Sequence, residues 1–149
     1  MQVVFELRCP ISADLGFIRD LIRMHGHHSG LRDPRLDNLV LAVNEAVTNV
    51  LDHAGTAGLI TARTTSESVT VEILDTAGRL THGHLAAAHE IDGTATHGYG
   101  LWVIQRLCDV VHLEQTGHGS RLSLEMRRHS PRRIRPVKPF RTAALLSHL

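Results

Sequence analysis

The chain has 149 residues, of which 42% are hydrophobic and 3% aromatic, and its formal net charge is +1. This length fits one domain with a hydrophobic core, and the composition excludes a wholly disordered chain. No apolar run approaches the ~20 residues that a transmembrane helix requires, and Glu6 within the first apolar stretch argues against a signal peptide. The two cysteines, Cys9 and Cys108, lie in apolar surroundings. We therefore expect reduced thiols and a cytoplasmic protein, and the alternative is a disulfide between the two cysteines.

The charge is distributed unevenly along the chain. From Arg127 onward there are seven basic residues and no acidic ones, whereas the preceding residues carry nine basic and 15 acidic side chains, a net charge of −6. Three prolines also interrupt residues 128–149. We therefore divide the chain into a folded domain at 1–127 and a basic tail at 128–149, with a short helix expected at 140–148.

The first half of the chain has the patterns of one strand, two helices and two further strands. Ser12 is the expected N-cap of the first helix, with Asp14 in its first turn. Asp33 is the expected N-cap of the second helix, with Pro34 at the first helical position. The predicted elements are a strand at 2–8, a helix at 12–25, a helix from Asp33 to near Gly55, and strands at 59–64 and 69–75 that form a hairpin.

The second half begins with a long stretch rich in Gly, Thr, His and Ala, which follows Asp75 and favours a functional lid with a short helix at 84–90. A helix then opens at Gly98 and Gly100, followed by strands at 110–116 and 120–127. This order of elements predicts an α/β two-layer sandwich with a mixed, mostly antiparallel sheet. The helices pack on one face of the sheet, and the other face is open to solvent or to a partner.

The second predicted helix carries an unusual polar face. Within LAVNEAVTNVLDHA (41–54), Glu45, Asn49 and Asp52 point in directions within about 60° of one another, with no Lys or Arg within a turn. Two carboxylates and a carboxamide suit a metal and its waters better than an ion-paired surface, although a solvated helix face is the alternative. The opposite, buried stripe is predicted to hold Leu36, Leu39, Val43, Val47, Val50 and Ala54.

Three glycine-bearing stretches follow that helix. They are DTAG (75–78), GYGL (98–101) and GHGS (117–120). The second opens a helix, where unpaired N–H groups and the positive end of the helix dipole favour a phosphate. Each stretch is weak evidence alone, because a glycine pair before a helix is usually only a helix start.

Taken together, the order and spacing of these motifs resemble the GHKL (histidine-kinase-like) ATPase superfamily. Within it, they resemble the single-domain anti-sigma-factor serine/threonine kinases of the RsbW type. NEAVTN (44–49) is similar to the N box of that family, and the three glycine stretches are similar to its glycine boxes. The resemblance covers about residues 2–127 and implies the Bergerat ATPase fold.

The resemblance also implies ATP and Mg²⁺ as cofactors and assigns roles to single residues. Asn49 would hold Mg²⁺ through its side-chain oxygen, and Glu45 would take the proton of the attacking hydroxyl. Asp75 would accept a hydrogen bond from the adenine amino group, and the backbone at Gly98 and Gly100 would approach the phosphates. The other residues that the resemblance places at the nucleotide are Asp52, Gly78, Tyr99, Leu101 and Ser120.

The first glycine box departs from the family pattern D-x-G-x-G. Ala77 and Arg79 stand where the pattern has glycines, and Gly78 is shifted between them. This departure favours an alternative hypothesis, a non-catalytic module that binds a sigma factor or another regulator without kinase turnover. The ATPase half of a sensor histidine kinase fits less well, because the chain leaves no room for a phosphoacceptor helical hairpin.

Partners are implied by the same resemblance. It predicts an anti-sigma factor that sequesters a sigma factor and phosphorylates a serine of an anti-anti-sigma antagonist with a STAS domain. It also implies a homodimer formed through the sheet and the first helix, without direct binding to nucleic acid or membrane. The basic tail is then either a solvated extension or an arm that contacts an acidic surface, on the body or on the sigma factor.

Histidine clusters give one further candidate site. The chain has 12 histidines, including HGHH at 25–28 and HGH at 82–84, with His89 beyond. This spacing can chelate zinc or nickel, and the alternative is a set of loop histidines that bind no metal.

Overall fold

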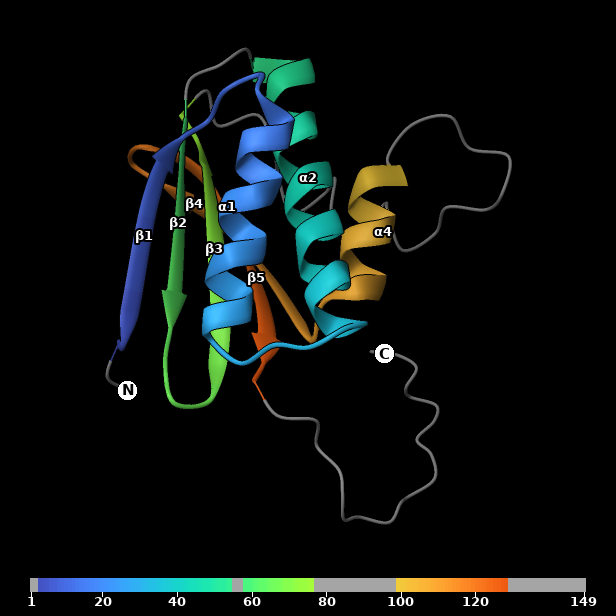
Figure 1. The fold of residues 1–149 in the computed structure, drawn as a ribbon. Helices are drawn as coiled ribbons and strands as arrows, with labels where there is room; N and C mark the ends of the chain where they lie inside the picture. The colour runs from blue at the N-terminus through green and yellow to red at the C-terminus, as the bar shows by residue number, and fades with distance from the viewer. Residues whose placement is uncertain (1–2, 55–57, 77–98, 129–149) are drawn as a thin grey trace, which may run out of the picture.

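Two layers make up the part of the chain that the computed structural model describes, which is residues 3–54, 58–76 and 99–128. Within these ranges, helices cover one face of a five-stranded sheet, as Figure 1 shows. The predicted α/β two-layer sandwich is therefore confirmed. The elements are β1 (Phe5–Pro10), α1 (Leu15–His28), α2 (Arg35–Ala54), β2 (Gly58–Thr64), β3 (Ser68–Asp75), α4 (Tyr99–Leu107), β4 (Val110–Thr116) and β5 (Gly119–Arg127).

The strands of the sheet lie in the order β1-β2-β3-β5-β4, and every neighbouring pair among the described strands is antiparallel. The expectation of a mixed sheet was therefore wrong for this part of the chain. The sheet is built from the hairpins β2–β3 and β4–β5, and the chain returns through α4 and β4 so that β5 pairs with β3. This return places the end of β3 beside the start of β5, with Asp75 opposite Ser120.

Helix starts differ by a residue or two from the predicted ones. Asp14, not Ser12, is the N-cap of α1, and its side chain accepts a hydrogen bond from the backbone N–H of Phe17 at 3.1 Å. Ser12 instead accepts from the backbone N–H of Asp14 through its hydroxyl oxygen at 3.2 Å. Both residues are good caps, and the chain uses the one adjacent to the helix.

The start of α2 keeps one predicted contact and changes another. The side chain of Asp33 accepts a hydrogen bond from the backbone N–H of Asp37 at 3.2 Å, in the first turn. The helix begins at Arg35, so Pro34 precedes the first helical residue instead of occupying it. A residue without an N–H donor is tolerated at either place, because the first turn of a helix leaves its N–H groups unpaired.

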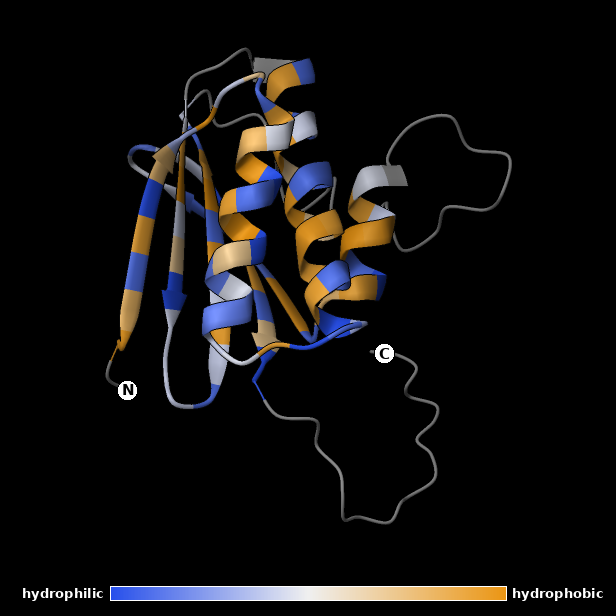
Figure 2. Cartoon of the chain, in the orientation of Figure 1, coloured by the Kyte–Doolittle hydropathy of each residue, from blue (hydrophilic) through white to orange (hydrophobic). Residues whose placement is uncertain are grey.

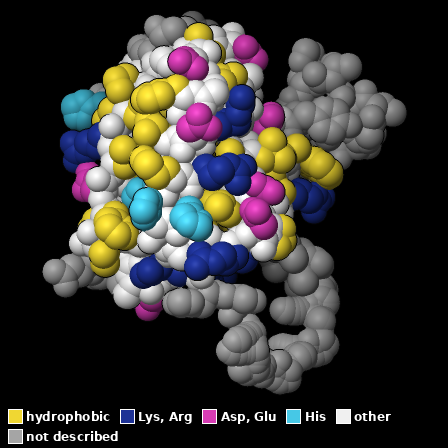
Figure 3. Space-filling model, in the orientation of Figure 1, with side chains coloured by type: hydrophobic (Ala, Val, Ile, Leu, Met, Phe, Trp, Pro, Cys, Tyr) yellow, Lys and Arg dark blue, Asp and Glu magenta, His cyan; other side chains and the backbone are white. Residues whose placement is uncertain are grey.

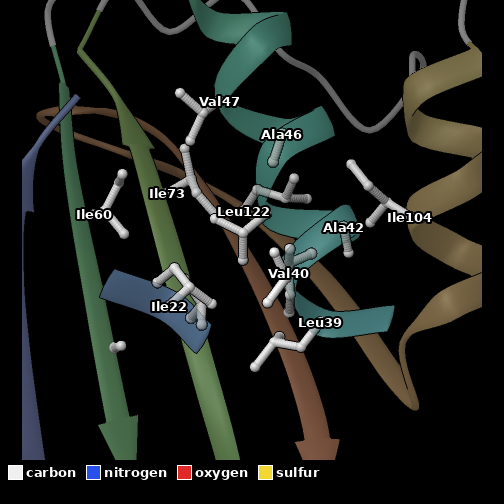
Figure 4. Packing of buried hydrophobic residues seen from close by; sticks show 14 of the residues in the cluster. Ile22, Leu39, Val40, Ala42, Ala46, Val47, Ile60, Ile73, Ile104 and Leu122 are labelled. Carbon is white, nitrogen blue, oxygen red and sulfur yellow. The ribbon is translucent and has the colours of Figure 1, made fainter. Parts of the chain in front are cut away.

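The core lies between the helices and the sheet. In Figure 2, hydrophobic and hydrophilic residues alternate along β1. Because successive side chains of a strand point to opposite faces, this alternation directs the hydrophobic ones toward the core. In Figure 4, Ile73 and Leu122 of the sheet lie against Ala46 and Val47 of α2. Burying one large aliphatic side chain stabilises the fold by about 1.5–3 kcal/mol, so this layer fixes α2 firmly. The predicted stripe is confirmed for its described side chains, which are Leu36, Leu39, Val43, Val47 and Val50.

The outer face of the sheet carries a row of alternating charges, which we call the outer charge ladder. Its members are Glu6, Arg63, Glu72, Arg121 and Glu114, one from each strand in spatial order. Two contacts are short, Arg63 to Glu72 at 2.8 Å and Arg121 to Glu114 at 2.9 Å. Exposed pairs of this kind each contribute about 0–1 kcal/mol. The open face is therefore polar.

No helix in the described ranges has both the length and the apolar character to cross a bilayer.

Candidate functional site

The carboxyl-terminal half of α2 presents its polar side chains toward the beginning of α4. The apolar stripe of α2 is held against the sheet, so Glu45 and Asn49 lie on the remaining side and are half-buried, while Asp52 is exposed. A Cβ atom added at Gly100 would lie 3.1 Å from both amide atoms of Asn49 and 3.3 Å from Oε1 of Glu45. The structure therefore brings Glu45, Asn49 and Gly100 together, and a side chain at position 100 would require the Asn49 and Glu45 side chains to shift.

Helix α4 adds its amino-terminal end to this cluster. Leu101 and Ile104 are buried and hold the helix in the core. Leu101, which the sequence places at the nucleotide, thus packs in the core at the start of α4. The first N–H groups of a helix have no partner within the helix and carry its positive dipole end. An anion and a hard cation both fit beside such an end when carboxylate and amide oxygens face it.

A second cluster lies where β3 ends and β5 begins. Asp75 and Ser120 are cross-strand partners and are 5% and 1% exposed, respectively. The Ser120 hydroxyl donates to Oε1 of Gln115 at 3.1 Å. A carboxylate is rarely buried without a polar partner, since desolvating it is costly. Asp75 and Ser120 are thus the polar cross-strand pair at the end of the core-facing row, which is otherwise apolar (Val69, Val71 and Ile73 opposite Met126, Leu124 and Leu122).

Both clusters lie at the same end of the molecule. In Figure 1 the carboxyl end of α2, the end of β3 and the amino end of α4 all lie at the upper end of the two layers. Gly119 helps to fix this end of the sheet. Its φ is +131°, and an added Cβ would overlap the carbonyl oxygen of Asp75, so only glycine fits there.

Within the described ranges, no arginine forms an ion pair with the carboxylates of this face of α2. No ion pair there joins Glu45 or Asp52 to an arginine, although the neighbouring Arg19 donates to Asn44 at 2.9 Å. The expectation of an acidic and amide face without basic partners therefore holds for the described part. This donor set fits Mg²⁺, which prefers oxygen ligands.

Some predicted residues lie outside the described ranges. These are Gly78 and Gly98, the substituted positions Ala77 and Arg79, the expected lid and its helix at 84–90, the histidines at 82–84 and 89, and the expected tail helix at 140–148. Tyr99 begins α4, but its side chain is likewise outside the description.

The histidine cluster at 25–28 does not form a metal site in the described part, where no group of three or more His, Cys, Asp or Glu side chains is placed to bind one. Instead, Nε2 of His25 lies 2.8 Å from the hydroxyl of Thr64, which lies 2.5 Å from that of Ser29. Burial and the neighbouring His28 lower the pKa of His25. No sequence motif indicated this buried polar cluster, because Thr64 is 35 residues from Ser29 and 39 residues from His25.

Both cysteines are free, so the disulfide that the sequence left open does not form. Burial raises the pKa of the Cys108 thiol to about 12 and also raises that of Cys9. Protonated thiols are poor nucleophiles, so neither cysteine is suited to act as a catalytic nucleophile.

The described residues thus form a two-layer α/β domain with a polar face on α2, a glycine in the first turn of α4 and a buried carboxylate at the end of β3. The sequence profile of the histidine kinase-like ATPase domain matches residues 12–126, and the chain belongs to this family. It is therefore a member of the GHKL-like ATPases, whose nucleotide is ATP.

Among solved structures, the chain is similar to one in the crystal structure of the SiaB–SiaC complex from Pseudomonas aeruginosa. The two are 16% identical with a TM-score of 0.55, and the match covers 84% of this chain and 90% of the other. At this identity the likeness establishes the fold. No protein with a curated description matches the sequence.

Proposed function

We propose that the chain is a cytoplasmic anti-sigma factor of the RsbW type with serine/threonine kinase activity. It sequesters a sigma factor and phosphorylates a serine of an anti-anti-sigma antagonist with a STAS domain. The observation that carries the proposal is the placement of Glu45 and Asn49 against Gly100 at the start of α4. A general base, a magnesium ligand and a phosphate-binding helix end are the parts that phosphoryl transfer requires in one place.

Each residue at this end has one task in the proposal. Asn49 holds Mg²⁺, which neutralises charge on the phosphates when it is bound. Glu45, one turn earlier on the same face, accepts the proton of the attacking serine hydroxyl. The backbone at Gly98 and Gly100 contacts the phosphates, and Asp52 borders the site from the next turn of α2.

In the proposal, the second cluster, Asp75 and Ser120, recognises the adenine base of ATP. Asp75 accepts a hydrogen bond from the adenine amino group, which guanine lacks at that position, and Ser120 lies beside it on β5. Gly78, Tyr99 and Leu101 complete the set of residues proposed at the nucleotide. A buried carboxylate discriminates well between bases, because an unsatisfied partner in a buried site is costly.

A homodimer is part of the proposal, formed along α1 and the free edge of β1. Phe17 and Met24, seven residues apart on one face of α1, are 52% and 50% exposed, and Val4 and Phe5 at β1 are 60% and 44% exposed. Figure 3 shows hydrophobic side chains gathered over α1 beside histidines. Since the outer face of the sheet carries the charge ladder, these flanking apolar residues suit a second copy better than the open face does. The similar solved structure is itself a complex of two proteins, which supports a protein partner.

The alternative is a non-catalytic module that binds a sigma factor or another regulator. Ala77 and Arg79 favour it, because they replace the glycines of the first glycine box. Such a module would bind its partner without turning over ATP.

Incubation of the purified chain with labelled ATP, Mg²⁺ and candidate STAS proteins separates the two functions. The kinase predicts transfer of label to a serine of one candidate and loss of that transfer in Glu45→Ala. The matched control is Glu72→Ala, which removes a carboxylate of the outer charge ladder and should leave transfer unchanged. Partner binding without transfer, under conditions where ATP binds, would favour the module.

A further inference from the structure

Gly58, the first residue of β2, lies in a place where three segments meet. It is the cross-strand partner of Asp75 on β3. Its carbonyl oxygen accepts a hydrogen bond at 3.2 Å from the backbone N–H of Ile11, just after β1. A Cβ added at Gly58 would overlap the carbonyl oxygen of Leu74 and lie 2.5 Å from Cδ1 of Ile11. No side chain fits between these two neighbours.

Space, and not backbone conformation, makes glycine necessary at position 58. Gly119 on the other side of β3 has φ +131°, a value that side chains rarely adopt, but Gly58 lies outside that region. The two neighbours of Gly58 also differ in how they can respond. The tip of the Ile11 side chain can rotate away, whereas the Leu74 carbonyl belongs to the strand and cannot move without moving Asp75, the next residue.

We propose that Gly58 is a positioning residue for Asp75. Together with Gly119, it leaves room for the backbone carbonyl groups of Leu74 and Asp75 at the end of β3, so that the buried Asp75 carboxylate keeps its place opposite Ser120. The consequence for base selection rests on the proposed role of Asp75 toward adenine. Gly58 touches no nucleotide in this scheme and acts only through the backbone of Leu74 and Asp75.

A purely structural role predicts a different pattern of effects. If Gly58 were needed only so that Ile11 can pack into the core, removal of Cδ1 by Ile11→Val would relieve Gly58→Ala. If the Leu74 carbonyl is the constraint, Ile11→Val leaves that overlap in place and brings no relief. Gly117→Ala is the matched control, because a Cβ there would meet no atom within 4 Å.

The first experiment needs no nucleotide. Amide chemical shifts and hydrogen exchange of ¹⁵N-labelled protein should change at Asp75 and Ser120 in Gly58→Ala and in the double variant with Ile11→Val. They should stay as in the wild type in Gly117→Ala. Unchanged signals at Asp75 in a folded Gly58→Ala protein would overturn the positioning role, whatever the protein binds. If Gly58→Ala alone does not fold, recovery of folding with Ile11→Val would make Ile11 the constraint and overturn the positioning role, whereas continued failure of the double variant would leave the Leu74 carbonyl as the constraint.

The second experiment measures the preference for ATP over GTP by calorimetry. Loss of one hydrogen bond to a charged group lowers affinity by about tenfold or more, so Asp75→Ala and Gly58→Ala should both reduce the preference by about that factor. Folded protein that was only destabilised would keep the wild-type ratio. If the wild type binds no ATP, the proposed function is wrong. The nuclear magnetic resonance experiment would still test the role of Gly58, because it needs no nucleotide. A wild-type ratio in Gly58→Ala, or its recovery with Ile11→Val, defeats the inference alone.

Discussion

Carboxylates on the two sides of this molecule have opposite surroundings. On the outer face of the sheet, Glu6, Glu72 and Glu114 each face an arginine of a neighbouring strand. On α2, Glu45 and Asp52 have no arginine partner in the described ranges, and Glu45 instead faces Gly100 and the start of α4. Chains that leave a half-buried carboxylate unpaired usually do so where a ligand or a reaction needs it. The outer face is therefore a surface of paired charges, and the α2 face is the candidate site.

Removal of Glu45, the proposed general base, should have the largest effect. Glu45→Ala is expected to lower phosphotransfer by ~10²–10⁴-fold while ATP binding stays nearly intact, because a base acts mainly in the transition state. Asn49→Ala is expected to weaken both, since a metal ligand also stabilises the bound ground state. Single-turnover transfer and calorimetry together measure the two quantities. Equal loss of ATP affinity in both variants would mean that Glu45 has the wrong role.

The buried His25 is a titratable group whose hydrogen-bond partner is the hydroxyl of Thr64 and not a charged side chain. Its pKa is lowered by burial and by His28 from an ordinary value of 6.5, so the unfolded chain binds a proton at a higher pH than the folded chain. The free energy of unfolding should therefore fall as the pH drops below 6.5. It should level off below the folded-state pKa, with a slope of at most about 1.4 kcal/mol per pH unit for this group.

Urea unfolding between pH 5 and pH 8 (about one unit or more on either side of the ordinary value) measures this dependence. His25→Gln should flatten the acid limb, whereas His112→Gln, on the exposed side of β4, should leave it as in the wild type. An acid limb that persists unchanged in His25→Gln would place its origin elsewhere.

Arg63→Ala breaks the outer charge ladder between β1 and β3. Arg63 pairs with both Glu6 and Glu72, and exposed pairs contribute about 0–1 kcal/mol each, so stability should fall by about 2 kcal/mol or less, and the loss should shrink at high salt. ATP affinity should be unaffected. Thermal unfolding at low and high salt measures the loss. A drop of several kcal/mol would show that the outer face is not a simple solvated surface.

Removal of the tail should have the smallest effect on the fold. Arg128, which the sequence assigns to the tail, is tied to the body: its Nε donates to the Ser29 carbonyl at 2.7 Å and its Nη1 to that of Thr65 at 3.0 Å. Deletion of 129–149 should therefore leave Tm and ATP affinity nearly unchanged and weaken partner binding by a salt-dependent factor. Aggregation of the truncated protein, or loss of ATP binding, would place part of the tail in the core.

Local periodicity was sufficient for the elements and for the alignment of Glu45 with Asn49, because both depend on residues a few positions apart. It could not choose between Ser12 and Asp14 as N-cap, since both are good caps two residues apart. The sheet order depends on β5 pairing with β3 across α4 and β4, a contact that hydrophobic patterns do not encode. A mixed sheet was therefore predicted where the described strands are antiparallel.

The site was predictable only in part, for the same reason. The proximity of Gly100 to Asn49 follows from the packing of α4 on α2, and sequence motifs indicated it only through the family resemblance. The neighbourhood of Gly58 and Asp75 requires the β2–β3 register, and a glycine at the start of a strand gives no local signal of it. The pairing of His25 with Thr64 is likewise long-range and stayed outside any motif.

Calorimetric titration of ATP into the wild type, Asn49→Ala and Glu72→Ala, with and without Mg²⁺, tests whether the face of α2 beside Gly100 is the ATP site. We expect Mg²⁺-dependent binding in the wild type and in Glu72→Ala, clear weakening in Asn49→Ala, and weaker binding of GTP throughout. An absence of ATP affinity in the millimolar range with or without Mg²⁺, or equal weakening in the two variants, would contradict it.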